Sequence, residues 1–398
     1  MKILFLSSLY RSPHLPERSA GNARIVGKMR SHAEVRVVVP LPWYPPLVSE
    51  KVPAWARMRA APALERDVDG EPIVHLRHAH VPGAARALYA SLYGLSLLPA
   101  LRREIERFRP DAMLSAWAYP DGTAAAALGR ALGVPTLVRV MGSDINEVAK
   151  LPLRRQQIAW ALRHLDGTIA VSTQLARACV ELGAPQHKVH FVPTGVDPEK
   201  FHPVDRAEAR RELGIDAKER VIVAPARLSP EKGVHFLVEA LARLEQRSPG
   251  RHRAVLVGSG SEEGALRELA AKLGVGERVS FAGWQDELRM KIYYAAADVA
   301  TLPSLSEGWP DALMEALACG CPVVASTVGG MPDIVALGGA GELFEPGDVP
   351  ALTDALAKVL DTRWDRDAIA KRLAPYDLAS TGRRYVELCA EAAGLPPL

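Results

Sequence analysis

Short apolar runs alternate with segments of helical periodicity along the chain, and this order constrains the fold more than any other feature. Apolar runs of this length, bounded by polar and turn-forming residues, are typical of buried strands. In the first half they are Lys2–Ser7, Glu34–Val39, Ile73–Leu76, Ala112–Ser115, Thr136–Val140 and Thr168–Val171. Strands that alternate with helices predict an α/β fold, with a mostly parallel sheet and helices on both faces.

A second series of the same kind occupies the other half of the chain. Its strands are Val221–Ala224, Ala254–Val257, Val279–Ala282, Val299–Leu302 and Pro322–Ser326. The segment 192–198, rich in Pro and Gly, separates the series and has the composition of a hinge. We therefore predict two doubly wound Rossmann-like domains, residues 1–196 and 197–378. Parallel sheets bind ligands at the carboxyl ends of their strands, so we expect the domains to face each other across a substrate cleft. Residues 41–62, with five prolines, are predicted to form a long loop.

Charge is distributed unevenly although the net charge is only +3. Residues 1–195 contain 25 Lys and Arg against 15 Asp and Glu, and the remaining residues contain 24 against 31. A basic first domain favours an anionic partner surface such as phospholipid headgroups, and a merely solvated basic face is the alternative. No basic patch is interleaved with stacking aromatic residues, so we expect no nucleic-acid partner.

The cysteines and the apolar segments indicate the compartment. Four cysteines in 398 residues do not form a disulfide framework, and Cys319 and Cys321 lack the further ligands of a zinc site. The apolar N-terminus is predicted to be a buried strand and not a signal peptide. The segment Ala87–Leu101 is too short to span a bilayer and contains Pro99. We expect a cytoplasmic protein. If the basic first domain binds anionic phospholipids, the protein would also bind peripherally at the inner face of the membrane.

The segment 304–326 is the most informative part of the sequence. It follows a strand, turns through Gly308 and Pro310, and becomes a helix from about Asp311. Glu307 lies in the loop and Glu315 in the helix, so the two carboxylates can each accept hydrogen bonds from different hydroxyl pairs of one elongated ligand. The helix N-terminus can meet a phosphate of that ligand.

Two further turns follow buried strands. In the first, Arg227 and Lys232 bracket a turn and can converge on a phosphate pair without a metal ion, although a solvated surface pair has the same pattern. In the second, Gly258 and Gly260 allow backbone to approach a ligand closely. This second turn is neither a P-loop nor the full dinucleotide fingerprint.

Together these motifs resemble glycosyltransferase family 4, whose members are retaining enzymes of the GT-B architecture. The resemblance extends from Lys2 to about Tyr385. It is strongest to the teichuronic acid and exopolysaccharide branch, on the sequence of the segments 307–312, 119–122 and 142–146. It implies a metal-independent hexosyltransferase that uses a nucleoside diphosphate sugar and no cofactor, with a saccharide or lipid-linked acceptor. It also implies that the residues 379–398 form a helix that returns to the first domain.

The resemblance assigns a role to each motif residue. Glu307 would hold hydroxyls of the donor sugar and, with Arg227 and Lys232 at the diphosphate, form the catalytic group. Glu315 would bind the ribose. The remaining donor-binding positions would be Gly21 in the loop 19–22, Gly258, Gly260, Gly283 beside the base, Trp309, Pro310, Asp311 and Ala312. Asp144 and Ser172 would line the acceptor side.

Two alternatives stay open. Many relatives have histidine where Met141 stands and near Trp117, and the absence of both favours a catalytically inactive sugar-nucleotide-binding subunit. A sugar-nucleotide epimerase of the same fold is the other alternative. Asp67 and Asp69 match a metal-binding Asp-x-Asp on paper, but they precede Gly70 and are predicted to form a turn, so no metal site is expected. Trp284 and Trp309 are interpreted as packing residues in preference to sugar-stacking platforms.

Overall fold

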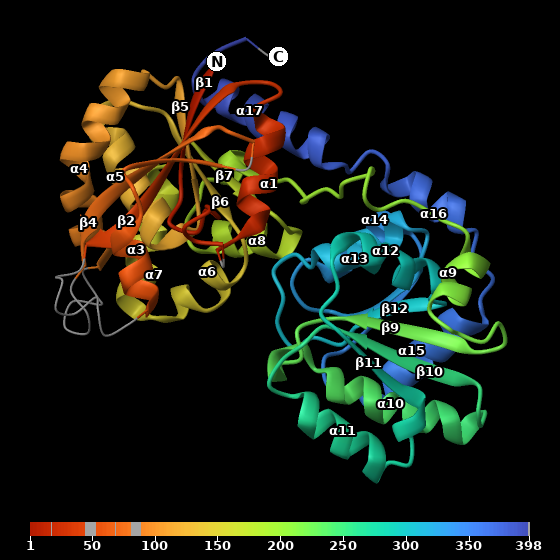
Figure 1. Ribbon diagram of the computed structural model, residues 1–398. Coiled ribbons are helices and arrows are strands. Elements are labelled where there is room, and N and C mark those ends of the chain that lie inside the picture. Colours follow the sequence, from red (N-terminus) through yellow and green to blue (C-terminus); the bar gives the residue numbers. More distant parts are fainter. Residues whose placement is uncertain (17, 44–52, 68, 81–88, 397–398) are drawn as a thin grey trace. The chain divides into compact units, whose positions relative to one another are not determined.

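A computed structural model describes residues 1–16, 18–43, 53–67, 69–80 and 89–396 of the chain (Figure 1). It divides into two compact units, which we call the N-terminal domain (Met1–Pro193 with Leu378–Leu398) and the C-terminal domain (Thr194–Asp377). The boundaries predicted after residues 196 and 378 lie within three residues of this division.

The N-terminal domain is built on one sheet. Within the described residues it has eight strands in the order β3-β4-β2-β1-β5-β6-β7-β8, and every neighbouring pair is parallel except β3 with β4. The strands are β1 (Lys2–Leu6), β2 (Glu34–Trp43), β3 (Leu64–Arg66), β4 (Pro72–Ala79), β5 (Ala112–Ala116), β6 (Thr136–Val140), β7 (Gly167–Ala170) and β8 (Val189–Phe191). The helices are α1 (Ala20–Met29), α3 (Pro53–Ala60), α4 (Tyr89–Phe108), α5 (Thr123–Leu132), α6 (Ser143–Asn146), α7 (Pro152–His164), α8 (Thr173–Glu181) and α17 (Leu378–Ala392).

Strand side chains alternate between two cores, one on each face of this sheet. Ile3 and Phe5 of β1 pack with residues of α1 and α17, whereas Leu4 packs with residues of α4 and α5. A strand buried on both faces in this way reads as a continuous apolar run, which is the pattern that the sequence shows.

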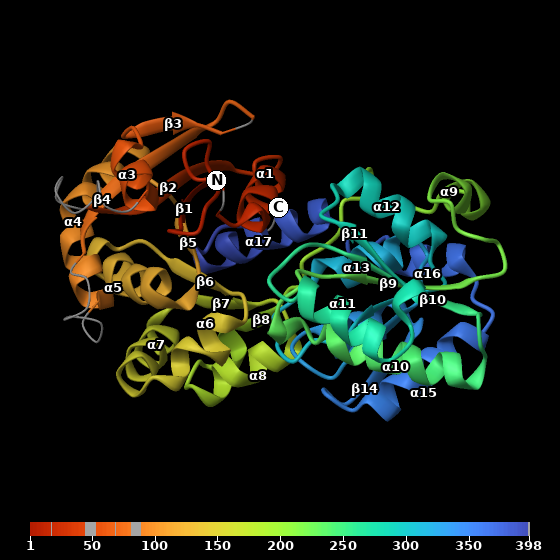
Figure 2. The same ribbon diagram turned by 60° about the horizontal axis from the view of Figure 1, so that its bottom comes forward.

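Helix α17 brings the C-terminal segment back to the N-terminal domain, where it lies beside α1 (Figure 2). Gly382 permits the close approach, because a Cβ at this position would lie 2.7 Å from Cβ of Lys28. Tyr385 is fully buried, and its hydroxyl accepts a hydrogen bond from Nε of Arg139 on β6 at 3.0 Å.

The C-terminal domain has a sheet in the order β11-β10-β9-β12-β13-β14, with every neighbouring pair parallel. The strands are β9 (Arg220–Pro225), β10 (His252–Val257), β11 (Val279–Gly283), β12 (Val299–Leu302), β13 (Val323–Ser326) and β14 (Gly341–Phe344). The helices are α9 (Arg206–Glu212), α10 (Val234–Arg247), α11 (Glu263–Lys272), α12 (Glu287–Ala296), α13 (Asp311–Ala318), α14 (Met331–Gly338), α15 (Val349–Asp361) and α16 (Arg366–Leu373). Figure 1 shows α12, α13 and α14 on one side of the sheet and α10 and α11 on the other.

Both sheets have the strand order of a doubly wound fold. The order reverses between β1 and β5 in the N-terminal domain and between β9 and β12 in the C-terminal domain. A ligand of such a sheet binds in the crevice at the carboxyl ends of these two strands. The predicted fold class, two Rossmann-like α/β domains, is confirmed.

The predicted long loop over 41–62 is wrong at both of its ends. Strand β2 continues to Trp43, paired with β4, and helix α3 begins at Pro53. Proline is tolerated at the first position of a helix because its missing N–H would have no partner there. The residues 44–52 lie outside the described residues. Edge strands β3 and β14, with mixed burial, carry no apolar run by which the sequence could predict them.

As expected, the chain turns between the antiparallel strands β3 and β4. The amide of Gly70 donates to the carbonyl of Asp67 at 3.0 Å, and the Asp67 carboxylate pairs with Arg30. Over the described ranges, no cluster of His, Cys, Asp and Glu is placed to hold a metal ion, and no helix is long and apolar enough to cross a membrane.

Candidate functional site

The loops that follow β9 and β12 form the centre of the candidate site. They flank the point where the strand order of the C-terminal domain reverses, and they contain the predicted residues Arg227, Lys232 and Glu307. The structure joins the two loops directly. The amide of Leu305 donates to the carbonyl of Glu231 at 2.8 Å.

Gly233 sets the course of the chain after β9. The residues Pro230–Lys232 form a 3₁₀ turn, and Gly233 follows with a φ of 61° before α10 begins. A Cβ at Gly233 would lie 2.2 Å from the carbonyl oxygen of Pro303 at the end of β12. Only glycine fits this left-handed position, so it brings Lys232 against the loop after β12.

Lys232 and Glu307 form an ion pair across the two loops. Nζ of Lys232 lies 2.6 Å from Oε1 of Glu307, and that oxygen also accepts a hydrogen bond from the Ser304 hydroxyl at 3.0 Å. The side chains are 21% and 10% exposed, so the pair is largely shielded from water. Shielding strengthens the attraction and fixes both groups before any ligand binds.

Arg227 is more accessible than Lys232. Its side chain is 70% exposed, and its guanidinium lies 3.1 Å from the carboxylate of Glu231, which is itself 44% exposed. An ion pair this open to solvent is screened by water and contributes little to stability. Arg227 can therefore be recruited by an anionic ligand at little cost.

Gly258 and Gly260 pack the loop after β10 onto the loop after β9. A Cβ at Gly258 would lie 2.0 Å from the Ala226 carbonyl oxygen, and one at Gly260 would lie 2.1 Å from that of Leu228. The close approach that the sequence predicts is thus an approach of backbone to backbone. Next to them, Gly283 has a φ of 67° and accepts a hydrogen bond from the Gly258 amide, with open space where a Cβ would lie.

The loop after β12 is also held from the side of β13. A Cβ at Gly329 would lie 2.2 Å from the Glu307 carbonyl oxygen, and one at Gly330 would lie 2.4 Å from the Trp309 ring. Nε1 of Trp309 donates to the carbonyl of Thr194 at 3.0 Å. Trp309 is therefore a packing residue, as predicted, and Gly329 and Gly330 are site-shaping residues that the sequence reasoning missed although the Gly-Gly pair follows a strand.

Trp284 corrects the prediction for the second tryptophan. Its side chain is 75% exposed at the end of β11, so it does not pack in the core. An exposed indole beside the carboxyl end of a strand has a free face for a ligand ring.

Helix α13 directs its N-terminus toward the same edge of the sheet. Pro310 occupies the N-cap position and has no N–H, so the donor-binding role predicted for Trp309 to Ala312 reduces to main-chain groups on either side of this proline. Asp311 and Ala312 form the first helical turn, where amides carry partial positive charge. Glu315 lies one turn further on, and its Oε2 accepts a hydrogen bond from the buried Tyr294 hydroxyl at 3.2 Å.

Gly21 is part of helix α1 and not of a loop. The helix begins at Ala20, so Gly21 stands in its first turn, and a Cβ there would meet Oγ of Ser19 only at 3.7 Å. The predicted loop over 19–22 is corrected to a helix N-terminus.

Asp144 and Ser172 do not line an open surface. Both are fully buried. The Asp144 carboxylate accepts hydrogen bonds from the backbone amides of Ala118, Met141, Gly142 and Ile145 at 2.9–3.3 Å. Burial raises the pKa of Asp144, whereas these four amides lower it. Ser172 is the N-cap of α8 and accepts from the amide of Leu175. The predicted acceptor-side role of both side chains is therefore corrected to positioning of the loops after β5, β6 and β7.

A buried polar group at the carboxyl ends of β1 and β5 was not predicted as a site. Both the amide and the hydroxyl of Ser8 donate to Oδ2 of Asp121 at 2.7 Å, and the Tyr93 hydroxyl donates to Oδ1 at 2.5 Å. Burial raises the pKa of Asp121 to about 6, against the opposing effect of these hydrogen bonds. The sequence signal that could have indicated this group is the Pro-Asp-Gly motif at 120–122, which follows a strand.

The arrangement in the C-terminal domain suits an anionic, polyhydroxylated ligand. Arg227, Lys232 and the first turn of α13 offer positive charge, and Glu307 and Glu315 offer hydrogen-bond acceptors on either side of it. Hydroxyl groups and a phosphate chain on one molecule would match this order of donors and acceptors.

Two family models match the chain, one in each domain. The model described as "Glycosyl transferases group 1" matches residues 205–374, and the model described as "Glycosyltransferase Family 4" matches residues 33–200.

Among curated proteins, D-inositol 3-phosphate glycosyltransferase of Nocardia farcinica is 39% identical over 235 residues, which are 57% of this chain and 51% of the relative. D-inositol 3-phosphate glycosyltransferase 2 of Catenulispora acidiphila is 34% identical over 255 residues, or 62% of this chain and 56% of the relative. The alignments span about half the length of these relatives.

Solved structures share the whole fold at low identity. Sucrose-phosphate synthase from Thermosynechococcus elongatus has a TM-score of 0.75 at 21% identity, and covers 98% of this chain and 99% of its own. HepE of Anabaena, solved with UDP, has a TM-score of 0.73 at 20% identity, and the match covers 98% of this chain and 100% of the HepE chain. These likenesses show the GT-B fold.

Proposed function

This chain belongs to glycosyltransferase family 4, and from that premise we propose that it transfers a hexosyl unit from a nucleoside diphosphate sugar, with retention of configuration. In the transfer, the bond between the anomeric carbon and the diphosphate breaks, and a bond to an acceptor hydroxyl oxygen forms on the same face of the sugar. The proton of that hydroxyl leaves with the diphosphate. The acceptor is a polysaccharide precursor or a glycolipid. The narrower teichuronic acid and exopolysaccharide branch remains a prediction.

The contact between Lys232 and Glu307 carries the proposal. It places a cation and a carboxylate 2.6 Å apart at the carboxyl ends of β9 and β12, where a doubly wound domain binds its ligand. Lys232 and Arg227 bind the diphosphate and neutralise the charge that grows on it as it leaves. Glu307 accepts hydrogen bonds from the sugar, and Glu315 accepts them from the ribose. Groups fixed in advance around a developing charge are the largest source of acceleration in many enzymes.

UDP-containing solved relatives of the fold support a nucleotide-sugar donor, since HepE of Anabaena binds UDP and UDP-glucose. The proposal involves no metal ion or further cofactor, because two cationic side chains and a helix N-terminus can serve the diphosphate. The cytoplasmic location that we propose agrees with four cysteines buried as free thiols. Peripheral membrane binding through the basic N-terminal domain would bring a lipid-linked acceptor within reach.

The test separates the diphosphate from the sugar. We would measure the thermal stabilisation of the purified chain by UDP, GDP and ADP and by the corresponding nucleotide sugars, in the wild type and in Lys232→Met, Glu307→Gln and Glu315→Ala. A ligand stabilises the fold according to its affinity. Lys232→Met should lose the response to both ligand classes, as should Glu315→Ala. Glu307→Gln should keep the response to the nucleoside diphosphate and lose the additional response to the sugar.

The control is a second ion pair of the same domain with the same separation. Lys358 and Glu342 lie 2.6 Å apart on α15 and β14, away from the site. Lys358→Met and Glu342→Gln should respond to every ligand as the wild type does. The proposal is refuted if no nucleotide stabilises the wild type, or if the site variants and the control variants respond alike. Binding without transfer to any acceptor would instead support the inactive sugar-nucleotide-binding subunit.

A further inference from the structure

A basic pocket of about 670 Å³ lies in the C-terminal domain, at the amino ends of β9 and β12. We use this name for the pocket lined by Arg206, Arg210, Arg211, Lys218, Arg220 and Asp298. Arg220 is the first residue of β9, and Asp298 directly precedes β12. The candidate donor site lies beyond the opposite ends of these same strands, so the two sites are separate.

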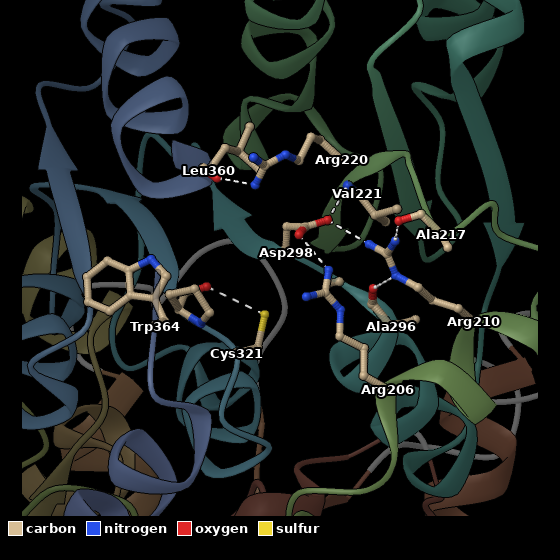
Figure 3. A network of polar contacts seen from close by, with 12 residues as sticks. Arg206, Arg210, Ala217, Arg220, Val221, Ala296, Asp298, Cys321, Leu360 and Trp364 are labelled. Carbon is tan, nitrogen blue, oxygen red and sulfur yellow. Dashed lines mark hydrogen bonds and ion pairs between the residues drawn. The ribbon is translucent and has the colours of Figure 1, made fainter. Parts of the chain in front are cut away.

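Two guanidinium groups share a single carboxylate in this pocket. Oδ1 of Asp298 lies 2.5 Å from Arg206, and Oδ2 lies 2.7 Å from Arg210 and accepts a hydrogen bond from the Val221 amide (Figure 3). Figure 3 also shows Arg220 turned to the Leu360 carbonyl. Glu219, the other carboxylate in the pocket lining, pairs with Arg253 and Arg278 outside it. The charge of Asp298 therefore cannot neutralise the cations around it.

The cations divide into scaffold and free donors. Arg210 is buried, and its guanidinium is occupied by Asp298 and by the carbonyls of Ala217, Asp216 and Ala296, which leaves it no group for a ligand. Burial lowers the pKa of Arg210, and the neighbouring Arg206 lowers it further, as expected where positive charge is in excess.

Arg211 and Lys218 are exposed, and within the described residues neither has an acidic partner. Nε of Arg206 is buried and has no hydrogen-bond partner in the described part of the chain. Arg211 and Lys218 can therefore reach a bound molecule without breaking an existing contact of the scaffold. Arginine binds phosphate oxygens in a bidentate manner, and lysine adds a point charge.

We propose that the basic pocket binds a small phosphorylated anion at a second site, distinct from the donor site. A volume of about 670 Å³ exceeds what one phosphate fills and falls in the range of metabolite pockets. Ile215 supplies an apolar wall for the rest of such a molecule. Binding at this end of β9 and β12 does not compete with a nucleotide at the other end.

The experiment uses Arg211→Ala with Lys218→Ala, because both side chains are exposed and their removal leaves the Asp298 network intact. The matched control is Arg243→Ala with Lys272→Ala, which removes two exposed cations from α10 and α11 of the same domain. Every protein also carries Lys232→Met, so that phosphate binding at the donor site is weakened equally. The probes are inorganic phosphate and glucose 6-phosphate, titrated calorimetrically against potassium chloride at equal ionic strength.

We expect the control protein to bind both probes, and the pocket variant to bind them about tenfold more weakly or worse, since it loses two charge-assisted contacts. Tighter binding of glucose 6-phosphate would indicate an organic phosphate as the ligand, and equal binding would indicate phosphate itself. The proposal is overturned if the pocket variant and the control bind equally, or if neither probe binds the Lys232→Met protein. Nucleotide-sugar binding is measured separately with a pocket variant that retains Lys232. A failure of the second-site proposal therefore leaves the proposed donor site untouched.

Discussion

Removal of the Asp144 carboxylate should destabilise the loops that follow β5 and β6 in the N-terminal domain. The carboxylate is fully buried and accepts hydrogen bonds from four backbone amides, one of which, that of Ala118, lies 26 residues away in the chain. In Asp144→Ala these amides lose their acceptor inside the protein. A hydrogen bond to a charged group contributes about 1.5–3 kcal/mol, and an orphaned buried donor costs about 1–3 kcal/mol.

The four contributions are not additive, because the loops after β5 and β6 can relax and admit water. We therefore expect Asp144→Ala to lose about 3–5 kcal/mol of stability, near the upper end for single substitutions. Asp144→Asn keeps one acceptor oxygen and should lose about half as much. Ser172→Ala, which removes one helix cap, should lose about 1 kcal/mol.

Native-state hydrogen exchange is the suitable assay, since two domains need not unfold together. In Asp144→Ala the amides of Ala118, Gly142 and Ile145 should exchange much faster than in the wild type, while amides of β9 and β10 stay unchanged. Equal exchange at these amides, together with a raised KM for the acceptor, would show that Asp144 faces the acceptor and would refute the reasoning.

Three other predictions concern single positions. Gly260→Ala should lower the melting temperature and weaken nucleotide binding, because its Cβ would lie 2.1 Å from the Leu228 carbonyl oxygen. As a control, Gly264→Ala, in α11 with open space around its Cβ, should stabilise the protein by up to about 1 kcal/mol. Burial raises the pKa of Asp121 from 3.8 to about 6, so the folded chain holds this proton more tightly than the unfolded chain, and the stability it contributes is full below pH 3.8 and lost as the pH rises through 6. Between pH 4 and pH 7 the wild type should therefore lose on the order of 2 kcal/mol of unfolding free energy relative to Asp121→Asn, as measured by denaturant unfolding at each pH. Parallel profiles of stability against pH for the two proteins would contradict this. Trp284→Ala should change stability by less than about 0.5 kcal/mol, as the residue is 75% exposed, and any loss of nucleotide affinity in that variant would assign the indole to the ligand.

The core strands and the donor-site loops were predictable because their signals are local. Most of the predicted strands are apolar runs that the structure buries, and Arg227, Lys232 and Glu307 follow such runs within a few residues. The turn between Asp67 and Gly70 was predictable for the same reason, since its hydrogen bonds join neighbours in the chain. The segment 41–62 was not, because its prolines are compatible both with a loop and with the start of α3.

The sequence by itself determined the alternation of strands and helices, the division into two domains and the position of the charged groups in the loops after β9 and β12. The tertiary structure alone decided which polar residues face a ligand. Asp144 and Ser172 have the residue types of a binding site, yet both are buried, whereas Trp284 has the type of a core residue and is exposed. The reason is that burial and hydrogen-bond partners come from segments distant in sequence: Arg206 and Arg210 meet Asp298 only where α9 packs beside the amino end of β12. No local pattern records such a meeting, and the basic pocket is visible only once the chain has folded.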